Sequence, residues 1–365
     1  MKLISVALNS FSNIMVYGAL FACMGVCALE SNYIDQQIFY RDAKQSIHFS
    51  HLQTDSELAH PAVKAITQDS MGFIWIATQD GLTKYNGLQS RHYFNDPSNP
   101  SSIGDNDIWA LHSDSEGRLW IGSESGIHLY TPESDSFVNF LDEPFGLTNG
   151  SYKAIKEDSQ GNIWFVARKS GLVKFDKTTS TFTSITHNEN TAYSLSSNDV
   201  IDIEFNSQGV MFVVSTHGLE YSADGGNTFH KFDKLEFQQP ENSLASLHID
   251  YQDRLWIGSS NNGIYALNTN QLTLVKRYPK SENPICSNVI NDLLTDENGQ
   301  LWIATNNGVC RLNIQTSEFD LFQSASSKSS SIINNQVNSL WLDAGGVMWF
   351  GTQSGVSHWN ASLLY

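Results

Sequence analysis

Four side chains near the middle of the chain combine positive charge with an aromatic ring. Tyr152 and Lys153 are adjacent, and Arg168 and Lys169 follow in a turn of the same repeat. An arginine guanidinium binds a carboxylate through two parallel hydrogen bonds, so this group predicts contact with an anion or a sugar acid. The alternative is a solvated turn whose cations pair with nearby Asp or Glu. His217, in the corresponding turn of the next segment, completes the candidate ligand-binding set.

The rest of the composition limits the chemistry. The 365 residues carry 21 Lys and Arg against 38 Asp and Glu, a formal net charge of −17. This excess repels phosphate backbones, so we expect no nucleic-acid partner. The chain contains no G-x-S-x-G, H-E-x-x-H, P-loop or EF-hand pattern, and its histidines and cysteines show no zinc-ligand spacing. We therefore expect no enzyme, no catalytic residue, no metal and no cofactor.

A repeated motif supplies the elements that position these side chains. In its commonest form the motif is an apolar run, an Asp, a Gly three residues later, and an aromatic residue three residues after that. It occurs seven times, with 44 to 48 residues between successive aromatic positions. This period is typical of a four-stranded blade of a β-propeller. The seven aromatic residues are Trp75, Trp120, Trp164, Phe212, Trp256, Trp302 and Trp349.

Each repeat divides into four strands, a to d, with a expected innermost and d at the rim. In the second repeat, Ile108 and Leu111 precede a turn from Asp114 to Gly117, and Leu119–Ser123 follows as strand b. An Asp that opens a turn and a Gly that closes it favour a hairpin. The tryptophan of strand b is expected to pack between adjacent blades as a core residue.

The two ends of the repeat region complement each other. The last repeat ends on strand c at Asn360 and lacks a rim strand, whereas Ser46–Leu52 has the alternation of a half-buried strand. Pairing of this segment with the last strand c would close the ring and leave no free edge. We therefore predict one all-β domain over residues 46–365, a seven-bladed β-propeller whose last blade is completed by an N-terminal strand.

The loops predict where a ligand binds. In a propeller, the d-to-a links and the b-to-c turns share one face around the mouth of the central channel, while the scaffold stays constant. The b-to-c turns are polar and rich in amides, except at Arg168 and Lys169. A recurring Asn eight residues before the turn acid is expected to cap the start of strand a rather than to form a ligand cage. These residues are Asn106, Asn198, Asn242, Asn288 and Asn335.

The first 28 residues are predicted to be a signal peptide. Lys2 supplies a short basic region, Ile14–Val26 is an apolar stretch, and small residues mark a cleavage site before Leu29. Residues 29–45 form a lead segment, and the mature protein is expected in the periplasm. Two alternatives remain: a lipoprotein signal in which Cys23 is lipidated, and an uncleaved anchor, for which the stretch is short.

Cys286 and Cys310 fall in one repeat, before strand a and at the start of strand c. An oxidising compartment permits a disulfide. Strand b, however, should hold strands a and c roughly 9 to 10 Å apart at ordinary strand spacing, which is beyond bridging distance. We therefore predict two independent thiols.

The repeat resembles the two-component regulator propeller family. The resemblance rests on units such as Asp69–Tyr85 (DSMGFIWIATQDGLTKY) and on the linker Phe94–Asp107 (FNDPSNPSSIGDND), and it covers about Ser46 to Asn360. In that family the repeat builds the periplasmic input region of bacterial sensors, including hybrid histidine kinases and diguanylate cyclases. The resemblance implies an extracytoplasmic propeller that senses or binds a small molecule, an oligosaccharide or a sensor protein.

The chain also departs from the family's usual pattern. Family members usually carry more repeats, an immunoglobulin-like domain, a membrane helix and a kinase or cyclase, which do not follow Tyr365 here. We therefore expect either a standalone relative that signals through a membrane-bound partner, or a piece of a longer sensor. The functional alternatives are a protein-interaction scaffold and an extracytoplasmic lyase or glycosidase, by analogy with virginiamycin-type lyases, which are also propellers.

The fourth repeat diverges most, since Phe212 replaces Trp and Asn206 replaces Asp. It also contains Ser222–Phe229 (SADGGNTF), which resembles the Asp-box of sialidases. In those proteins the box is a hairpin turn away from the catalytic centre, so we expect a structural turn. A sialidase would also need an arginine cluster, a Tyr nucleophile and a paired acid, and the few arginines here are dispersed.

Overall fold

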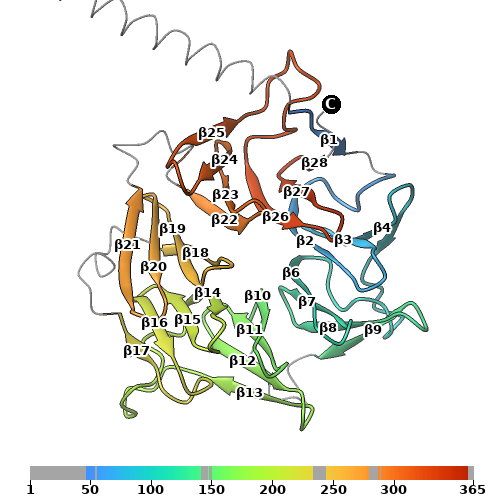
Figure 1. Ribbon diagram of the computed structural model, residues 1–365. Coiled ribbons are helices and arrows are strands. Elements are labelled where there is room, and N and C mark those ends of the chain that lie inside the picture. The colour runs from blue at the N-terminus through green and yellow to red at the C-terminus, as the bar shows by residue number, and fades with distance from the viewer. Residues whose placement is uncertain are drawn as a thin grey trace, which may run out of the picture. The chain divides into compact units, whose positions relative to one another are not determined.

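The structure is a computed structural model that describes residues 47–53, 56–140, 147, 150–232, 244–278, 287 and 289–360. These residues form strands and no helix, and the strands make seven four-stranded antiparallel sheets around a common axis (Figure 1). The predicted seven-bladed β-propeller is confirmed. The predicted signal peptide, residues 1–28, and lead segment, residues 29–45, lie outside the described residues.

The first three blades each consist of four consecutive strands. Blade one contains β2 (Val63–Gln68), β3 (Ile74–Thr78), β4 (Leu82–Tyr85) and β5 (Ser90–Tyr93). Blade two contains β6 (Ile108–Ser113), β7 (Leu119–Ser123), β8 (Ile127–Thr131) and β9 (Ser136–Phe140). Blade three contains β10 (Tyr152–Glu157), β11 (Ile163–Ala167), β12 (Gly171–Asp176) and β13 (Thr181–Ile185). The first strand of each blade lies innermost, beside the first strand of the next blade (Figure 1).

The next three blades repeat this order. Blade four contains β14 (Val200–Phe205), β15 (Met211–Ser215), β16 (Gly218–Ser222) and β17 (His230–Lys231). Blade five contains β18 (Leu244–Ile249), β19 (Arg254–Ser259), β20 (Ile264–Asn268) and β21 (Thr273–Tyr278). Blade six contains β22 (Ile290–Thr295), β23 (Gln300–Thr305), β24 (Gly308–Asn313) and β25 (Phe319–Phe322).

Blade seven joins the two ends of the described chain. It contains β26 (Val337–Leu342), β27 (Val347–Thr352) and β28 (Gly355–Asn360), and β1 (Ser50–Leu52) is its fourth strand. β1 pairs antiparallel with β28, with Ser50 opposite His358. The predicted closure by the N-terminal segment is confirmed, and it gives the last blade a rim strand.

The second strand of each blade forms the core. In six blades its tryptophan donates a hydrogen bond of 2.7 to 2.9 Å from Nε1 to Oδ2 of the turn Asp six residues earlier. In each case Oδ1 of that Asp accepts backbone N–H groups of the turn, as in the bond from Phe73 to Asp69 at 2.9 Å. Trp75, which is fully buried, packs on Tyr93 of its own blade and Tyr130 of the next. The predicted core role of the tryptophan is confirmed.

Blade four changes both members of this pair. Phe212 has no N–H to donate, and its partner position holds Asn206. The Asn206 Oδ1 accepts the backbone N–H of Val210 at 2.8 Å, as the Asp residues do, while Nδ2 donates to Thr269 Oγ1 at 3.2 Å. An amide therefore satisfies the turn without leaving a buried carboxylate oxygen that has no donor.

The Asp-box of blade four is a hairpin turn between β16 and the very short β17, as predicted. Asp224 closes this turn by accepting the hydroxyl of Thr228 at 2.6 Å and the backbone N–H of Thr228 at 2.9 Å. These hydrogen bonds favour the charged form and lower the pKa of Asp224 to about 2. The box lies at the rim of its blade and has a structural role in this turn.

Three of the five predicted asparagine caps lie among the described residues, and all three act on the backbone. Each Oδ1 accepts an N–H eleven residues earlier at 2.6 to 2.7 Å, in the pairs Asn95 with Asn106, His187 with Asn198, and Ser324 with Asn335. Each backbone carbonyl of these asparagines accepts the N–H of a Gly in a b-to-c turn. The capping prediction is confirmed for these three residues, and Asn242 and Asn288 lie outside the described residues.

The prediction of independent thiols was wrong. Cys310, on β24, is disulfide-bonded, and its partner lies outside the described residues. The prediction assumed that both cysteines of this repeat are held at strand spacing, but β22 begins only at Ile290, after Cys286. A residue that precedes its strand is not bound by the distance between strands.

Candidate functional site

Every innermost strand contains a β-bulge at the same position. The pairing register shifts after the first residue of the strand, so the second residue has no partner on the next strand. A bulge changes the direction of the side chain at its extra residue, and here all seven of these side chains line the central channel. The bulge residues are Lys64, Trp109, Lys153, Ile201, Ala245, Asn291 and Asn338.

The channel has two parts that share most of these bulge residues. Its mouth is a cavity of about 610 Å³, which Gln79 and Gln353 from two b-to-c turns also line. The deeper part, of about 440 Å³, runs along the innermost strands. The mouth lies on the face where the loops predicted ligand binding, and its size suits a small molecule.

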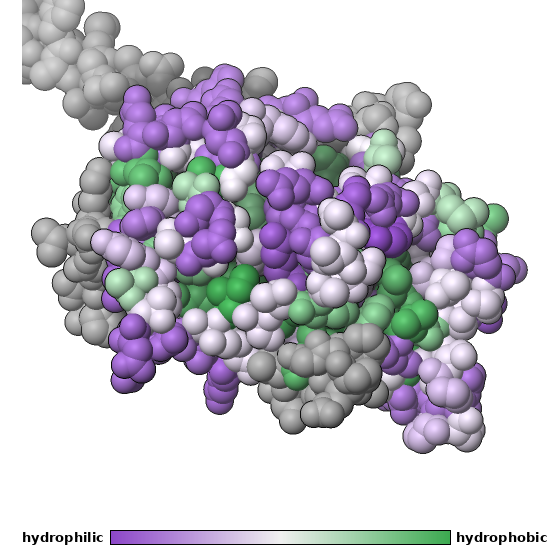
Figure 2. Space-filling view, turned by 90° about the horizontal axis from the view of Figure 1, so that it is seen from below, coloured by the Kyte–Doolittle hydropathy of each residue, from purple (hydrophilic) through white to green (hydrophobic). Residues whose placement is uncertain are grey.

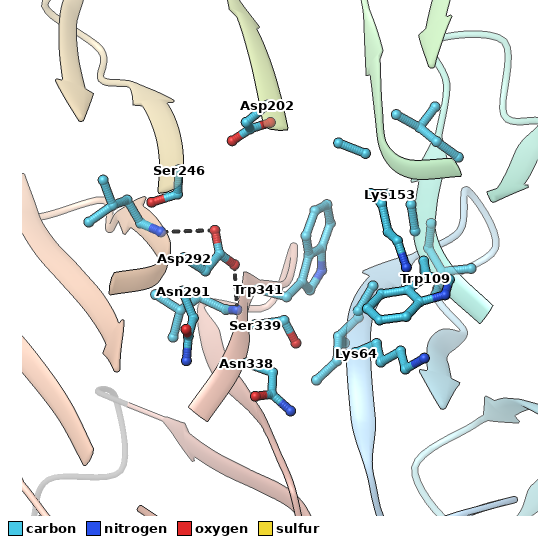
Figure 3. Close-up of a pocket in the computed structure, with 18 of the residues that line it drawn as sticks. Lys64, Trp109, Lys153, Asp202, Ser246, Asn291, Asp292, Asn338, Ser339 and Trp341 are labelled. Atoms are coloured by element: carbon cyan, nitrogen blue, oxygen red, sulfur yellow. Dashed lines mark hydrogen bonds between the residues drawn. The ribbon is translucent and has the colours of Figure 1, made fainter. Parts of the chain in front are cut away.

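Blades one to three form a cationic wall of the mouth (Figure 3). The Nζ atoms of Lys64 and Lys153 lie 3.3 Å and 2.6 Å from the centroid of the Trp109 ring. Two ammonium groups so close to one centroid would overlap on a single face, so they flank the ring. Attraction to the indole π-system stabilises both positions. Trp109 thus holds two positive charges at a fixed separation.

Both lysines have acidic neighbours, but the two pairs differ. Lys64 forms a close ion pair with Asp107. Lys153 lies 3.4 Å from Glu124, whose side chain is 55% exposed and also accepts the Trp109 Nε1–H at 3.0 Å. Burial lowers the pKa of Lys153 to about 8; Glu124 opposes this shift, and the positive charges of Lys64 and Arg168 add to it. The half-buried Lys153 therefore has one largely exposed acidic partner and two positive neighbours.

The structure separates the predicted site residues. Lys153 is at the mouth, and Arg168 lies near enough to affect its charge. Arg168 and Lys169 are exposed in the turn between β11 and β12, and neither forms an ion pair with any described residue. Tyr152 is fully buried against Phe165 in the core between blades two and three, and it lines neither part of the channel. His217 is exposed in the turn of blade four.

A second wall, which adjoins Lys64 around the ring, consists of two anchored amides from blades six and seven (Figure 3). Asn291 Nδ2 donates to the backbone carbonyl of Val337 at 2.6 Å, and Asn338 Nδ2 donates to that of Val63 at 2.8 Å. In each case the acceptor is the first residue of the next blade's innermost strand. These contacts join neighbouring blades and fix the orientation of both amides.

Deeper in the channel, two carboxylates occupy equivalent positions of blades four and six. Asp202 Oδ2 accepts the N–H of Leu247, and Asp292 Oδ2 accepts that of Leu340, both at 2.8 Å and both from the next blade. Burial raises the pKa of Asp202 to about 7 and that of Asp292 to about 6. Among the described residues, no group of three His, Cys, Asp or Glu side chains could hold a metal ion.

Reasoning from the sequence found Lys153 but missed Lys64, Trp109, Asn291 and Asn338. A usable signal was present, because each bulge residue stands eleven positions before the repeat's aromatic residue, directly after the first apolar residue of strand a. Alignment of the seven repeats at this position would have identified the bulge residues that line the channel. The alternation of apolar and polar residues in a regular strand does not predict the bulge.

The fold and site together define a seven-bladed β-propeller with a polar channel mouth built from bulge residues. The sequence profile of the family described as two component regulator propeller matches residues 102–125, 146–168 and 284–307. The chain therefore carries two component regulator propeller repeats, as the resemblance predicted. No curated protein sequence matches the chain.

Solved structures with the same fold include extracellular domains of putative two component and one component systems, and a lyase. The extracellular domain of a putative hybrid two component system from B. thetaiotaomicron is 24% identical, with a TM-score of 0.73 over 86% of this chain and 42% of its own. That of a putative one component system from the same organism is 20% identical, with a TM-score of 0.71 over 85% of this chain and 39% of its own. The chain thus spans about two fifths of these two domains.

Virginiamycin B lyase from Staphylococcus aureus is 14% identical, with a TM-score of 0.65 over 85% of this chain and 98% of its own. Identities at this level show a common fold and leave function to the residues of the site. Among the described residues, no helix is long and apolar enough to cross a membrane.

Proposed function

We propose that this protein is an extracytoplasmic ligand-sensing module of a bacterial signal-transduction system, and that its ligand binds at the channel mouth. One observation carries the proposal: seven structurally equivalent bulge positions hold five different residue types. The turn acids and the core tryptophans, by contrast, repeat with little change. A surface that varies on a constant scaffold is typical of a binding site.

The proposed location of the module has separate support from the sequence, the disulfide and the similar structures. The predicted signal peptide and the disulfide at Cys310 support export to an oxidising compartment, and the related sensor propellers are extracellular domains. We place the protein in the periplasm. As a non-enzymatic module it would pass its signal to a membrane-bound partner, or to further domains if it is a piece of a longer sensor.

A thermal-shift screen of the exported protein, purified from the periplasm of an expressing bacterium, tests this function. A ligand at about 100 times its Kd adds about 2.7 kcal/mol of stability, which gives a clear shift of Tm. We expect a saturable shift from a small metabolite, reduced by Lys153→Gln. A folded protein that responds to no compound in a broad collection would argue against small-molecule sensing.

The described surface supports an interaction scaffold less well. Large exposed apolar side chains such as Met71, Leu88 and Tyr251 lie on separate parts of the chain. On the face that Figure 2 shows, hydrophilic and intermediate residues interrupt the hydrophobic areas. A docking surface for another protein would gather such side chains into one patch.

A lyase is the second candidate, because the match with virginiamycin B lyase covers 98% of the lyase chain. Asp202 and Asp292 are the acidic residues lining the described channel whose pKa values are raised by burial. Their oxygens, however, accept backbone N–H groups. Incubation of any binding compound with the protein, followed by NMR, separates the two functions: an unchanged compound supports sensing, and conversion supports an enzyme.

A further inference from the structure

The two walls of the channel mouth offer opposite hydrogen-bonding chemistry. The ammonium groups of Lys64 and Lys153 are donors and carry positive charge. Farther around the mouth, in blades six and seven, Asn291 and Asn338 both direct their Nδ2 atoms to backbone carbonyls. Figure 3 shows these two groups of side chains on different sides of the same space.

The anchoring of the amides determines what they offer a ligand. Asn291 Nδ2 also donates to Asn306 Oδ1 at 2.8 Å, so both of its N–H groups are used. Because Nδ2 of each residue is tied to a carbonyl oxygen, the Oδ1 atoms cannot exchange places with it. No described residue donates a hydrogen bond to Oδ1 of Asn291 or Asn338. This wall therefore presents hydrogen-bond acceptors.

The cationic wall has an incomplete set of negative partners. The close partner of Lys64 is Asp107, whereas the ion-pair partner of Lys153 among the described residues is the exposed Glu124 at 3.4 Å. Arg168, whose positive charge acts on Lys153, has no ion-pair partner among the described residues. Burial is the largest cause of the lowered pKa of Lys153, and the positive charges of Lys64 and Arg168 add to it. An anion placed beside Lys153 would supply the missing charge.

We infer that the mouth binds a small carboxylate whose other end carries hydroxyl or amine donors, a molecule of the hydroxy-acid or amino-acid class. The carboxylate lies on the Lys64 and Lys153 wall, and the donors reach Oδ1 of Asn291 and Asn338. This inference rests on the proposed sensing function, because it names the ligand class of the same site.

Two sets of matched probes test both halves of the inference. The first set is D-gluconate, D-glucitol and hexanoate, and the second is L-serine, serinol and propanoate. Within each set the first compound has a carboxylate and donors, the second lacks the carboxylate, and the third lacks the donors. Calorimetry and NMR titration of the full protein should show the first compound of at least one set binding about tenfold or more tightly than the other two.

Variants at each wall test which wall binds the carboxylate of the ligand and which binds its hydrogen-bond donors. Lys153→Gln should weaken the binding of the carboxylate with donors about tenfold, because a charged hydrogen bond is lost. Lys276→Gln is the control, because it removes the same charge from an exposed rim position on β21 and should change affinity less than about twofold. Asn338→Leu should weaken the same compound but leave the donor-free carboxylate unaffected.

The pH dependence gives an independent readout. A bound anion favours the protonated Lys153, so affinity should fall as the pH rises above about 8, where the free protein loses that proton. The fall should be absent in Lys153→Gln. Affinity that does not change between pH 7 and pH 9 in the unaltered protein would contradict the assignment of the carboxylate to Lys153.

The outcomes separate the inference from the proposed function. If the neutral or donor-free probe binds as tightly as its partner, the ligand class is wrong and sensing at the mouth stands. If neither set binds but the broad screen finds a ligand that Lys153→Gln does not affect, the inference is again overturned and sensing remains. If no compound of any kind binds, both fail.

Discussion

The turn end and the mouth end of the innermost strands differ in how much their residues vary from blade to blade. At the turn end, a buried Asp accepts the indole N–H of a tryptophan in six of the seven blades. At the mouth end, the bulge residue is Lys, Trp, Ile, Ala or Asn, depending on the blade. The difference shows that the first position holds the blades together, whereas the second is free to serve binding.

Blade four extends this comparison within the scaffold itself. It replaces Asp and Trp together, by Asn206 and Phe212, and Asn206 gives its amide hydrogen to Thr269. The change of both partners leaves no buried carboxylate without a donor. In this blade the turn residue and its partner on the second strand thus differ together from those of the other six blades.

The largest effect should come from Trp302→Phe in blade six. This change leaves the buried Oδ2 of Asp296 without its 2.8 Å donor and opens space in the core. We expect the free energy of unfolding to fall by about 2 to 4 kcal/mol, measured from urea unfolding. Trp109→Phe is the control at the mouth, where a loss below about 1 kcal/mol is expected. Equal losses at both sites would break the comparison.

A transplant of the blade four pair into blade six sharpens the same point. In Asp296→Asn with Trp302→Phe, no buried charge is left without a donor. We expect the double variant to be more stable than the sum of the two single changes by about 1 to 2 kcal/mol. The four unfolding curves of this double-mutant cycle measure the coupling. Strict additivity would show that the two positions are independent.

The deep channel should make stability depend on pH. The folded-state pKa of Asp202, about 7, lies above its ordinary value of 3.8, so the folded protein holds a proton that the unfolded chain releases. The free energy of unfolding should therefore fall by roughly 1 to 3 kcal/mol as the pH rises from 4 to 7. Asp202→Asn should flatten this slope, whereas Asp80→Asn, at an exposed turn, should not. An unchanged slope in Asp202→Asn would assign the effect to other groups.

Removal of a cap should have a smaller effect. Asn106→Ala leaves the backbone N–H of Asn95 without its 2.6 Å acceptor. We expect a loss of about 1 kcal/mol, detectable as a lower urea midpoint with an unchanged slope. Asn227→Ala, in the exposed Asp-box hairpin, is the comparison and should cost less. A neutral Asn106→Ala would remove the capping role and reopen the ligand-cage interpretation of these residues.

The smallest effect on stability should come from Lys153→Gln. Its ammonium is poorly balanced by charge at the mouth, so its loss should change the free energy of unfolding by less than about 0.5 kcal/mol at pH 7. Thermal unfolding of the variant beside the unaltered protein measures this. A loss as large as that of Trp302→Phe would place Lys153 in the scaffold instead of the binding surface.

Most of the fold followed from local patterns. The spacing of Asp114, Gly117 and Trp120 predicts a turn followed by a buried strand, and its sevenfold recurrence predicts the ring. The closing strand was also predictable, because β28 lacked a partner on one side and Ser46–Leu52 had the alternation of a half-buried strand. The thiol of Cys310 was mispredicted, because the argument used strand spacing for a residue that precedes its strand.

The sequence predicted only part of the candidate binding site. Arg168 and Lys169 were chosen for their unusual charge in a polar turn, and they led to Lys153 as a neighbour. Tyr152 was included because it is adjacent to Lys153, but successive residues of a strand point to opposite sides, and Tyr152 faces the core. The cationic partner Lys64 and the amides Asn291 and Asn338 lie in distant repeats and gave no local sign of meeting.

The sequence by itself determined the blades, their number and the way the ring closes, because turn chemistry, strand alternation and a repeated tryptophan act over a few residues at a time. Only the tertiary structure decided which side chains share the channel mouth. Ring closure brings Lys64 and Asn338 from opposite ends of the repeat sequence into one cavity, and the bulges turn them toward it. Contacts of this kind depend on where whole blades lie, and no local pattern specifies that.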